Sequence, residues 1–160
     1  LILQANKLRC YFMDKEMNIL RERYYVDEKK TEPTWKIVRN HPIIMKYIGK
    51  DPLTVSIMAT VIGYHKGLRI PGSFGYSSGG WMQNVQQGTI SESQQNAIAI
   101  IVAIAVKEEG IEILNRDVIT IQNIAHEFGN GGVHELLKIL NLESETVVMN
   151  KLLSIMRKPI

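Results

Sequence analysis

The pattern of hydrophobic and polar positions predicts a chain built from helices. Leu3–Tyr25 carries apolar residues at mixed three- and four-residue spacing, and Trp35–Ile48 places most of its apolar residues roughly on one side. Both spacings match the helical period of about 3.6 residues. Pro42 lies inside the second segment, where it removes a backbone donor and clashes with the preceding turn. We therefore expect two short helices, or one kinked helix, in this segment.

Start and stop signals define the next helix. Asp51 suits the N-cap, Pro52 suits the first helical position, and Gly67 follows the end of the pattern. An N-cap aspartate accepts a hydrogen bond from a free backbone N–H, and proline at the first position has none to satisfy. Glycine ends helices because it adopts the left-handed conformation at low cost. The sequence predicts a helix from residue 52 to about residue 66.

The longest apolar run, Ala97–Val106, lies between polar neighbours. A helix that is apolar in every direction is typically buried on all sides. We therefore expect a buried central helix over about residues 97–109, closed by Gly110. Thr89 and Glu92 match a capping box at its start. The run is about half as long as a bilayer span requires, so the sequence predicts no membrane partner.

Glycines divide the remaining helical pattern. We expect helices over Val118–Phe128, Val133–Leu140 and Glu145–Arg157, with a turn that begins at Gly129 between the first two. We interpret those two helices as a tight helical hairpin. A DNA-reading helix-turn-helix is the alternative, because an alanine four residues before the turn glycine matches its opening. Its recognition face is not basic, which favours the hairpin.

Residues 67–88 hold six glycines and three serines, which is typical of a long loop or a small β-hairpin. Within them, Gly75-Tyr76-Ser77-Ser78-Gly79 resembles the nucleophile elbow of the α/β-hydrolases. That resemblance implies a serine hydrolase that acts through Ser77. The elbow requires a strand before it and a fold of alternating strands and helices. The pattern here predicts neither, so a hydrolase is the least favoured function and we assign no catalytic residue.

The sequence holds no complete motif for a metal or cofactor site. The single cysteine, Cys10, excludes an internal disulfide framework and a cysteine-based zinc site. His126 and Glu127 resemble part of a zinc-protease helix, but that motif needs a second histidine where Asn130 stands. His134 comes eight residues after the first. We therefore expect no metal and no cofactor, and the lone thiol fits an intracellular, cytoplasmic location.

Charge is distributed unevenly along the chain. Residues 1–50 carry 11 Lys/Arg and 6 Asp/Glu, whereas residues 101–160 carry 6 and 8. A basic segment with interleaved aromatic residues suits contact with phosphates and stacking on bases. A solvated helical face with ordinary salt pairs is the alternative. The predicted nucleic-acid contacts are Arg21, Arg23, Lys29, Lys30, Lys36 and Arg39.

Length and composition indicate one helical domain over residues 1–160, because 45% hydrophobic and 22% charged residues are ordinary for a globular protein. We expect a non-catalytic helical subunit that binds the backbone of RNA or DNA, or that assembles with other subunits of a nucleoprotein complex. Trp81 and Trp35 are the predicted interface anchors. The alternative is a protein-interaction or oligomerisation module, which includes self-association into a homo-oligomer.

Overall fold

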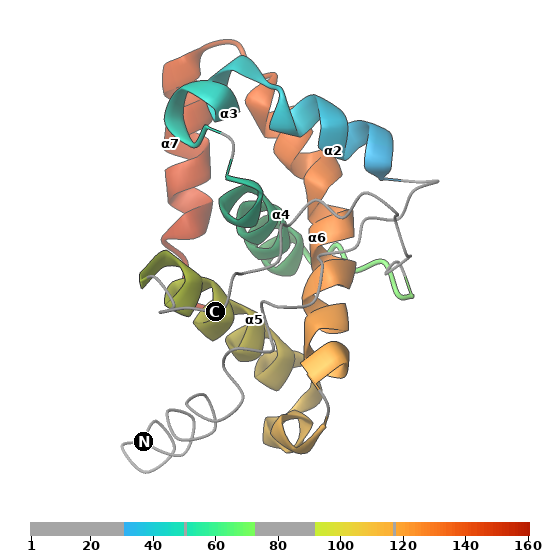
Figure 1. The fold of residues 1–160 in the computed structure, drawn as a ribbon. Coiled ribbons are helices and arrows are strands. Elements are labelled where there is room, and N and C mark those ends of the chain that lie inside the picture. Colours follow the sequence, from blue (N-terminus) through green and yellow to red (C-terminus); the bar gives the residue numbers. More distant parts are fainter. Residues whose placement is uncertain (1–30, 50, 73–91, 117) are drawn as a thin grey trace.

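The structure is a computed structural model that describes residues 31–49, 51–72, 92–116 and 118–160 (Figure 1). All the secondary structure in these ranges is helical, which confirms the all-α prediction. The helices are α2 (Glu32–Arg39), α3 (Pro42–Tyr47), α4 (Pro52–Lys66), α5 (Glu92–Glu109), the 3₁₀ helix η1 (Ile111–Asn115), α6 (Val118–Leu140) and α7 (Glu145–Met156). The helix predicted at Leu3–Tyr25 and most of the predicted glycine-rich loop or hairpin, with Ser77 and Trp81, lie outside the described residues.

The caps of α4 form as the sequence predicts. The Asp51 carboxylate accepts a hydrogen bond from the backbone N–H of Leu53 at 3.1 Å. Gly67 adopts the left-handed conformation, with φ of 65°, and ends the helix. Its backbone N–H reaches the carbonyl of Tyr64 at 3.1 Å, and the next N–H reaches that of Gly63 at 2.8 Å. These contacts satisfy two carbonyls that the helix end would otherwise leave open.

Pro42 separates two helices, which confirms the expected interruption. His41 is extended, with ψ of 135°, and its ring accepts a hydrogen bond from the N–H of Ile43 at 3.3 Å. Pro42 then occupies the first position of α3, where a missing N–H costs nothing. The chain therefore turns between α2 and α3 instead of continuing one long helix.

The predicted turn at Gly129 is wrong. Val118–Phe128 and Val133–Leu140 belong to one continuous helix, α6, and the Gly129–Gly132 stretch lies inside it. None of the three glycines in this stretch has positive φ. Both the helical hairpin and the helix-turn-helix are therefore excluded. A pattern with several glycines normally predicts a break, because each glycine costs a helix about 1 kcal/mol relative to alanine.

Close approach of α6 to α4 and to the residue Leu68 after it explains two of these glycines, Gly131 and Gly132. A Cβ atom on Gly132 would lie 1.9 Å from the carbonyl oxygen of Ala59, and one on Gly63 would lie 2.0 Å from that of Phe128. A Cβ atom on Gly131 would lie 1.8 Å from the carbonyl oxygen of Leu68. Real Cβ atoms do not approach backbone atoms this closely. Glycine is needed here for backbone approach, not for a turn.

The paired helices α4 and α6 form the centre of the fold. One core cluster joins them to α2, α3 and α7, and the other joins them to α5 and η1. Side chains of α4 and α6 contribute to both clusters, whereas those of α5 belong to the second alone. Figure 1 shows the arrangement, with α6 running the length of the molecule beside α4.

The prediction of a buried central helix at about 97–109 is therefore partly wrong. The helix exists and ends at Glu109 before Gly110, whose φ is 83°. It lies at one side of the fold, with Ile98, Ile101 and Ile104 buried and Ala99 exposed. Alanine counts as apolar in the sequence pattern, yet it tolerates exposure because it has little surface to hide. A run rich in alanine therefore overstates burial.

Candidate functional site

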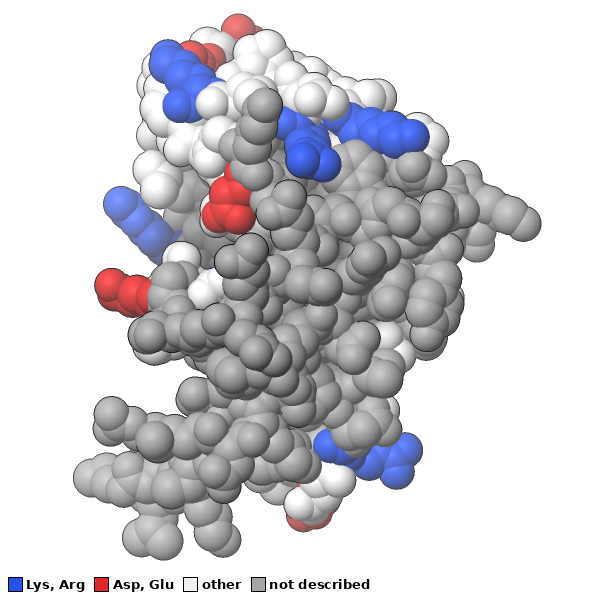
Figure 2. Space-filling view, viewed as in Figure 1, with Lys and Arg blue, Asp and Glu red and all other residues white. Residues whose placement is uncertain are grey.

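Two of the predicted nucleic-acid contacts lie in the described part of the chain. Lys36 and Arg39 occupy the last turn of α2, where the first is exposed and the second is half-buried. Arg21, Arg23, Lys29 and Lys30 lie outside the described residues. On the face drawn in Figure 2, Lys and Arg side chains lie across the upper part of the molecule, over α2 and α3. The candidate site is this basic surface.

A buried polar cluster holds α2 against α6. The Asn130 side-chain oxygen accepts hydrogen bonds from the hydroxyl of Thr31 at 2.9 Å and from the indole N–H of Trp35 at 3.1 Å. Asn130 and Thr31 are fully buried. Val38 completes the contact as part of the core around Leu136. Buried residues at positions 31, 35 and 38 leave the opposite side of α2 facing solvent.

Trp35 has a core role. Its side chain is 3% exposed, so it offers almost no surface to a partner. The prediction that it anchors an interface is therefore not supported by its position. Trp81, the other predicted anchor, lies outside the described residues. A tryptophan on a short helix is a common interface anchor, but here the indole N–H finds its acceptor inside the fold.

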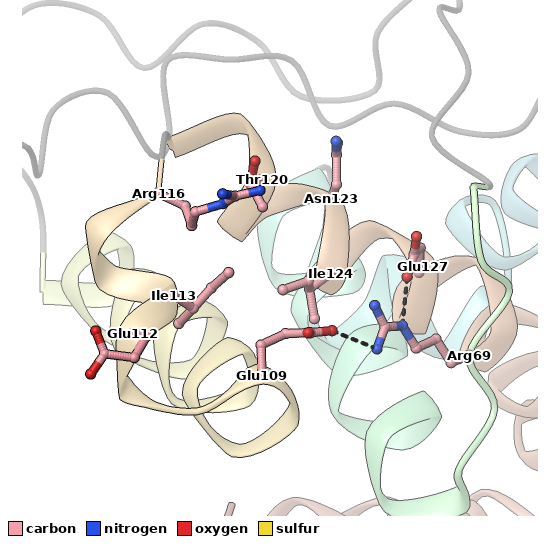
Figure 3. A pocket seen from close by; sticks show the side chains of 9 residues that line it. All are labelled: Arg69, Glu109, Glu112, Ile113, Arg116, Thr120, Asn123, Ile124 and Glu127. Atoms are coloured by element: carbon pink, nitrogen blue, oxygen red, sulfur yellow. Dashed lines mark hydrogen bonds and ion pairs between the residues drawn. The ribbon is translucent and has the colours of Figure 1, made fainter.

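A polar cleft with a volume of about 470 Å³ lies beside the first half of α6 (Figure 3). Its lining comes from the segment after α4, from the end of α5, from η1 and from the first half of α6: Arg69, Glu109, Glu112, Ile113, Arg116, Thr120, Asn123, Ile124 and Glu127. Figure 3 shows Arg69 joined to both Glu127 and Glu109. Glu112 and Arg116 also line the cleft.

Ion pairs to one arginine connect carboxylates of the cleft. The Arg69 guanidinium contacts Glu127 at 2.5 Å, Glu109 at 3.2 Å and Glu108 at 3.5 Å. Burial alone would lower the pKa of Arg69, but the hydrogen bonds and charges of Glu127 and Glu109 outweigh it and raise that pKa. The other Glu127 oxygen accepts the backbone N–H of Gly72 at 2.9 Å. This arrangement fastens the segment after α4 to α6.

The residues that resemble a zinc-protease helix do not form a metal site. His126 is buried, and burial lowers its pKa to about 3. His134 lies two helical turns further along α6, about 12 Å away by helix geometry, and contacts Thr34 on α2 at 3.0 Å. Across the described ranges, no group of three or more His, Cys, Asp or Glu could hold a metal ion.

No helix in the part of the chain that the structure describes is long and apolar enough to cross a membrane.

Sequence reasoning missed the ion pair of Arg69 and Glu127 and the amide of Asn130. Arg69 and Glu127 each have an apolar neighbour in the sequence, Leu68 before the arginine and Phe128 after the glutamate, and Asn130 stands between two glycines. A charged or amide side chain among buried residues needs a partner, and the apolar neighbours of Arg69 and Glu127 were a signal of such burial. The partner itself could not be named, because it lies 58 residues away for Arg69 and 95 residues away for Trp35.

Comparisons of the chain with protein-family models, with curated proteins and with solved structures find no match. The function must therefore be argued from the chain's own residues.

Proposed function

We propose that this chain is a non-catalytic helical subunit that binds the phosphate backbone of nucleic acid through its basic N-terminal third. The observation that carries the proposal is the placement of Lys36 and Arg39 in the last turn of α2. That helix is fastened to α6 by buried hydrogen bonds to Asn130. The basic end of the helix is thus held on a firm support. Preorganised cations lose less conformational entropy on binding than cations on a free segment.

The charge distribution along the chain supports the same function. Residues 1–50 carry 11 Lys/Arg against 6 Asp/Glu, and α2 belongs to this segment. Phosphate contacts are driven by charge and by release of counterions, and they need neither a reactive cluster nor a deep pocket. The cleft beside Arg69 is lined by two arginines and three glutamates, so its net charge is negative and it suits phosphate contact less well than the basic end of α2.

Fluorescence anisotropy with labelled single-stranded RNA, single-stranded DNA and double-stranded DNA tests the proposal, at about 50 mM salt, where phosphate contacts are strong. Heparin serves as the non-nucleic polyanion. We expect tight binding to at least one nucleic acid. Lys36→Ala/Arg39→Ala should weaken it about tenfold or more. Lys29→Ala/Lys30→Ala should do the same if the sequence prediction for that pair holds.

The matched control is Lys107→Ala/Arg116→Ala, which removes two exposed charges, one in the last turn of α5 and one directly after η1. It should bind as the wild type does. Lys36→Arg/Arg39→Lys should restore binding, which separates loss of charge from loss of fold. Absence of binding to every nucleic acid contradicts the proposal and favours the protein-interaction module. Equal affinity for heparin and all nucleic acids also contradicts it, because the chain would then be a general polyanion binder.

A further inference from the structure

We infer that the phosphate-binding surface continues from α2 across the exposed ridge of α6 to the end of α4, so that Lys138 and Lys66 are nucleic-acid contacts. This inference rests on the proposed function and extends it to two residues that lie 16 and 88 positions after residue 50, the end of the basic N-terminal segment. The basic residues form three groups that are far apart in the sequence: Lys36 and Arg39 on α2, Lys66 at the end of α4, and Lys138 on α6. The fold places these groups on neighbouring helices.

The first step along this surface leads from α2 to α6. Thr34 and His134 lie 3.0 Å apart, so the exposed side of α2 borders the position of His134. Lys138 is one helical turn further along α6, on the same face. Its side chain is 77% exposed. The ridge of α6 next to α2 therefore carries two groups that can meet phosphate, and neither is buried.

The second step leads from α6 to α4. Glu135 forms an ion pair with Lys138 at 3.5 Å and another with Lys66 at 3.5 Å. Lys66 is the last residue of α4, and its side chain is 41% exposed. One carboxylate thus lies between two lysines from different helices. Two cations that share one anion leave a net positive charge on this part of the surface.

The end of α4 has a further cation close by. Burial lowers the pKa of His65, and the positive charge of Lys158 lowers it further. Lys158 follows α7, so a third element contributes positive charge beside the last turn of α4. Lys66 also complements the negative end of the helix dipole. The helix dipole alone therefore accounts for a lysine at position 66, but it does not account for Lys138 and Lys158 lying nearby.

Four acidic residues of the C-terminal part form ion pairs away from this ridge. Glu108, Glu109 and Glu127 contact Arg69 at the cleft. Glu145 forms an ion pair with Lys46 on α3 at 2.8 Å. Residues 101–160 carry 6 Lys/Arg and 8 Asp/Glu. This sum does not show that lysines and most of the named glutamates lie on different parts of the folded surface. Glu135 is the acidic side chain paired with the ridge lysines.

Three variants test the inference by anisotropy with the nucleic acid that the wild type binds best. Lys66→Ala/Lys138→Ala should weaken binding about tenfold or more, and Lys66→Arg/Lys138→Arg should retain it. Glu135→Gln should strengthen binding about threefold, because it releases both lysines from a competing charge. A purely structural role of Glu135 gives no increase. Lys107→Ala/Arg116→Ala again serves as the control of equal charge.

The outcomes separate the two proposals. If Lys36→Ala/Arg39→Ala weakens binding and Lys66→Ala/Lys138→Ala leaves it unchanged, the proposed function stands and the ridge is excluded. If the wild type binds no nucleic acid, both fail. If Glu135→Gln leaves binding unchanged or weakens it while its melting temperature equals that of the wild type, the inference about the ridge is overturned.

Discussion

At the scale of single residues, buried polar groups determine how neighbouring segments are joined. Glu127 contacts three groups of the segment after α4. Its carboxylate accepts hydrogen bonds from the Arg69 guanidinium and from the backbone N–H of Gly72. Its backbone carbonyl accepts the N–H of Ile70 at 3.1 Å. Asn130 does the same for the first turn of α2. A buried polar group contributes to stability only while its partners remain in place.

We predict that Glu127→Gln lowers the free energy of unfolding by about 2–3 kcal/mol, because it replaces a charge-assisted hydrogen bond with a neutral one and leaves the Arg69 charge half-buried. Urea unfolding measures this difference. Glu112→Gln, an exposed position on the same cleft, should change it by less than about 0.5 kcal/mol. Equal losses in the two variants would show that the contact with Arg69 contributes no specific stability.

A second prediction concerns His126, whose pKa burial lowers to about 3. The unfolded chain takes up a proton near pH 6.5, whereas the folded chain does not. Stability from this residue is therefore complete above about pH 6.5 and is lost as the pH falls toward 3, by about 1.4 kcal/mol per unit. Between pH 7 and pH 5 the loss should be about 2 kcal/mol.

Urea unfolding at the two pH values isolates this effect when the wild type is compared with His126→Gln. The variant should lack that part of the pH dependence, and His134→Gln, at an exposed position, should retain it. If wild type and His126→Gln lose stability equally between pH 7 and pH 5, the buried histidine is not the group that titrates.

At the scale of helices, the contact between α4 and α6 depends on glycine. We predict that Gly132→Ala lowers the free energy of unfolding by about 3 kcal/mol or more, because the new Cβ would lie 1.9 Å from the Ala59 carbonyl oxygen and the backbone has to move. Gly63→Ala should act similarly, at 2.0 Å from the Phe128 carbonyl oxygen. Ser154→Ala, on the exposed side of α7, is the control and should change little. A stable Gly132→Ala protein with unchanged helicity would contradict the close crossing.

The helices show which local signals a sequence carries. The ends of α4 follow from Asp51 and Gly67, and the break before α3 follows from Pro42, because each residue acts through its own backbone geometry. The continuity of α6 could not be predicted in this way. Gly132 faces the backbone of α4 and Gly131 faces that of Leu68 directly after it. These partners lie far back in the sequence, and their close approach offsets the cost of glycine in the helix. Local patterns also gave no sign that α4 pairs with α6. The sequence therefore predicted α5 as the central helix, whereas the pair of α4 and α6 forms the centre of the fold.

At the scale of the whole molecule, the fold separates charges that the sequence mixes. Counting charge by segments indicated a basic N-terminal third and an acidic C-terminal part, and this led to Lys36 and Arg39 as candidate contacts. It gave no reason to consider Lys66 or Lys138, since neither lies in a basic segment. Their grouping depends on the ion pairs with Glu135 and on the contact of Thr34 with His134, which join α2, α4 and α6.

The salt dependence of nucleic-acid affinity tests this account most directly. The wild type and the variant Lys36→Ala/Arg39→Ala/Lys66→Ala/Lys138→Ala are compared by anisotropy over about 50–200 mM salt. Four lost phosphate contacts should flatten the slope of log affinity against log salt concentration by about 3. Circular dichroism confirms that the variant remains helical. A folded variant whose slope equals that of the wild type would show that phosphates do not bind this surface.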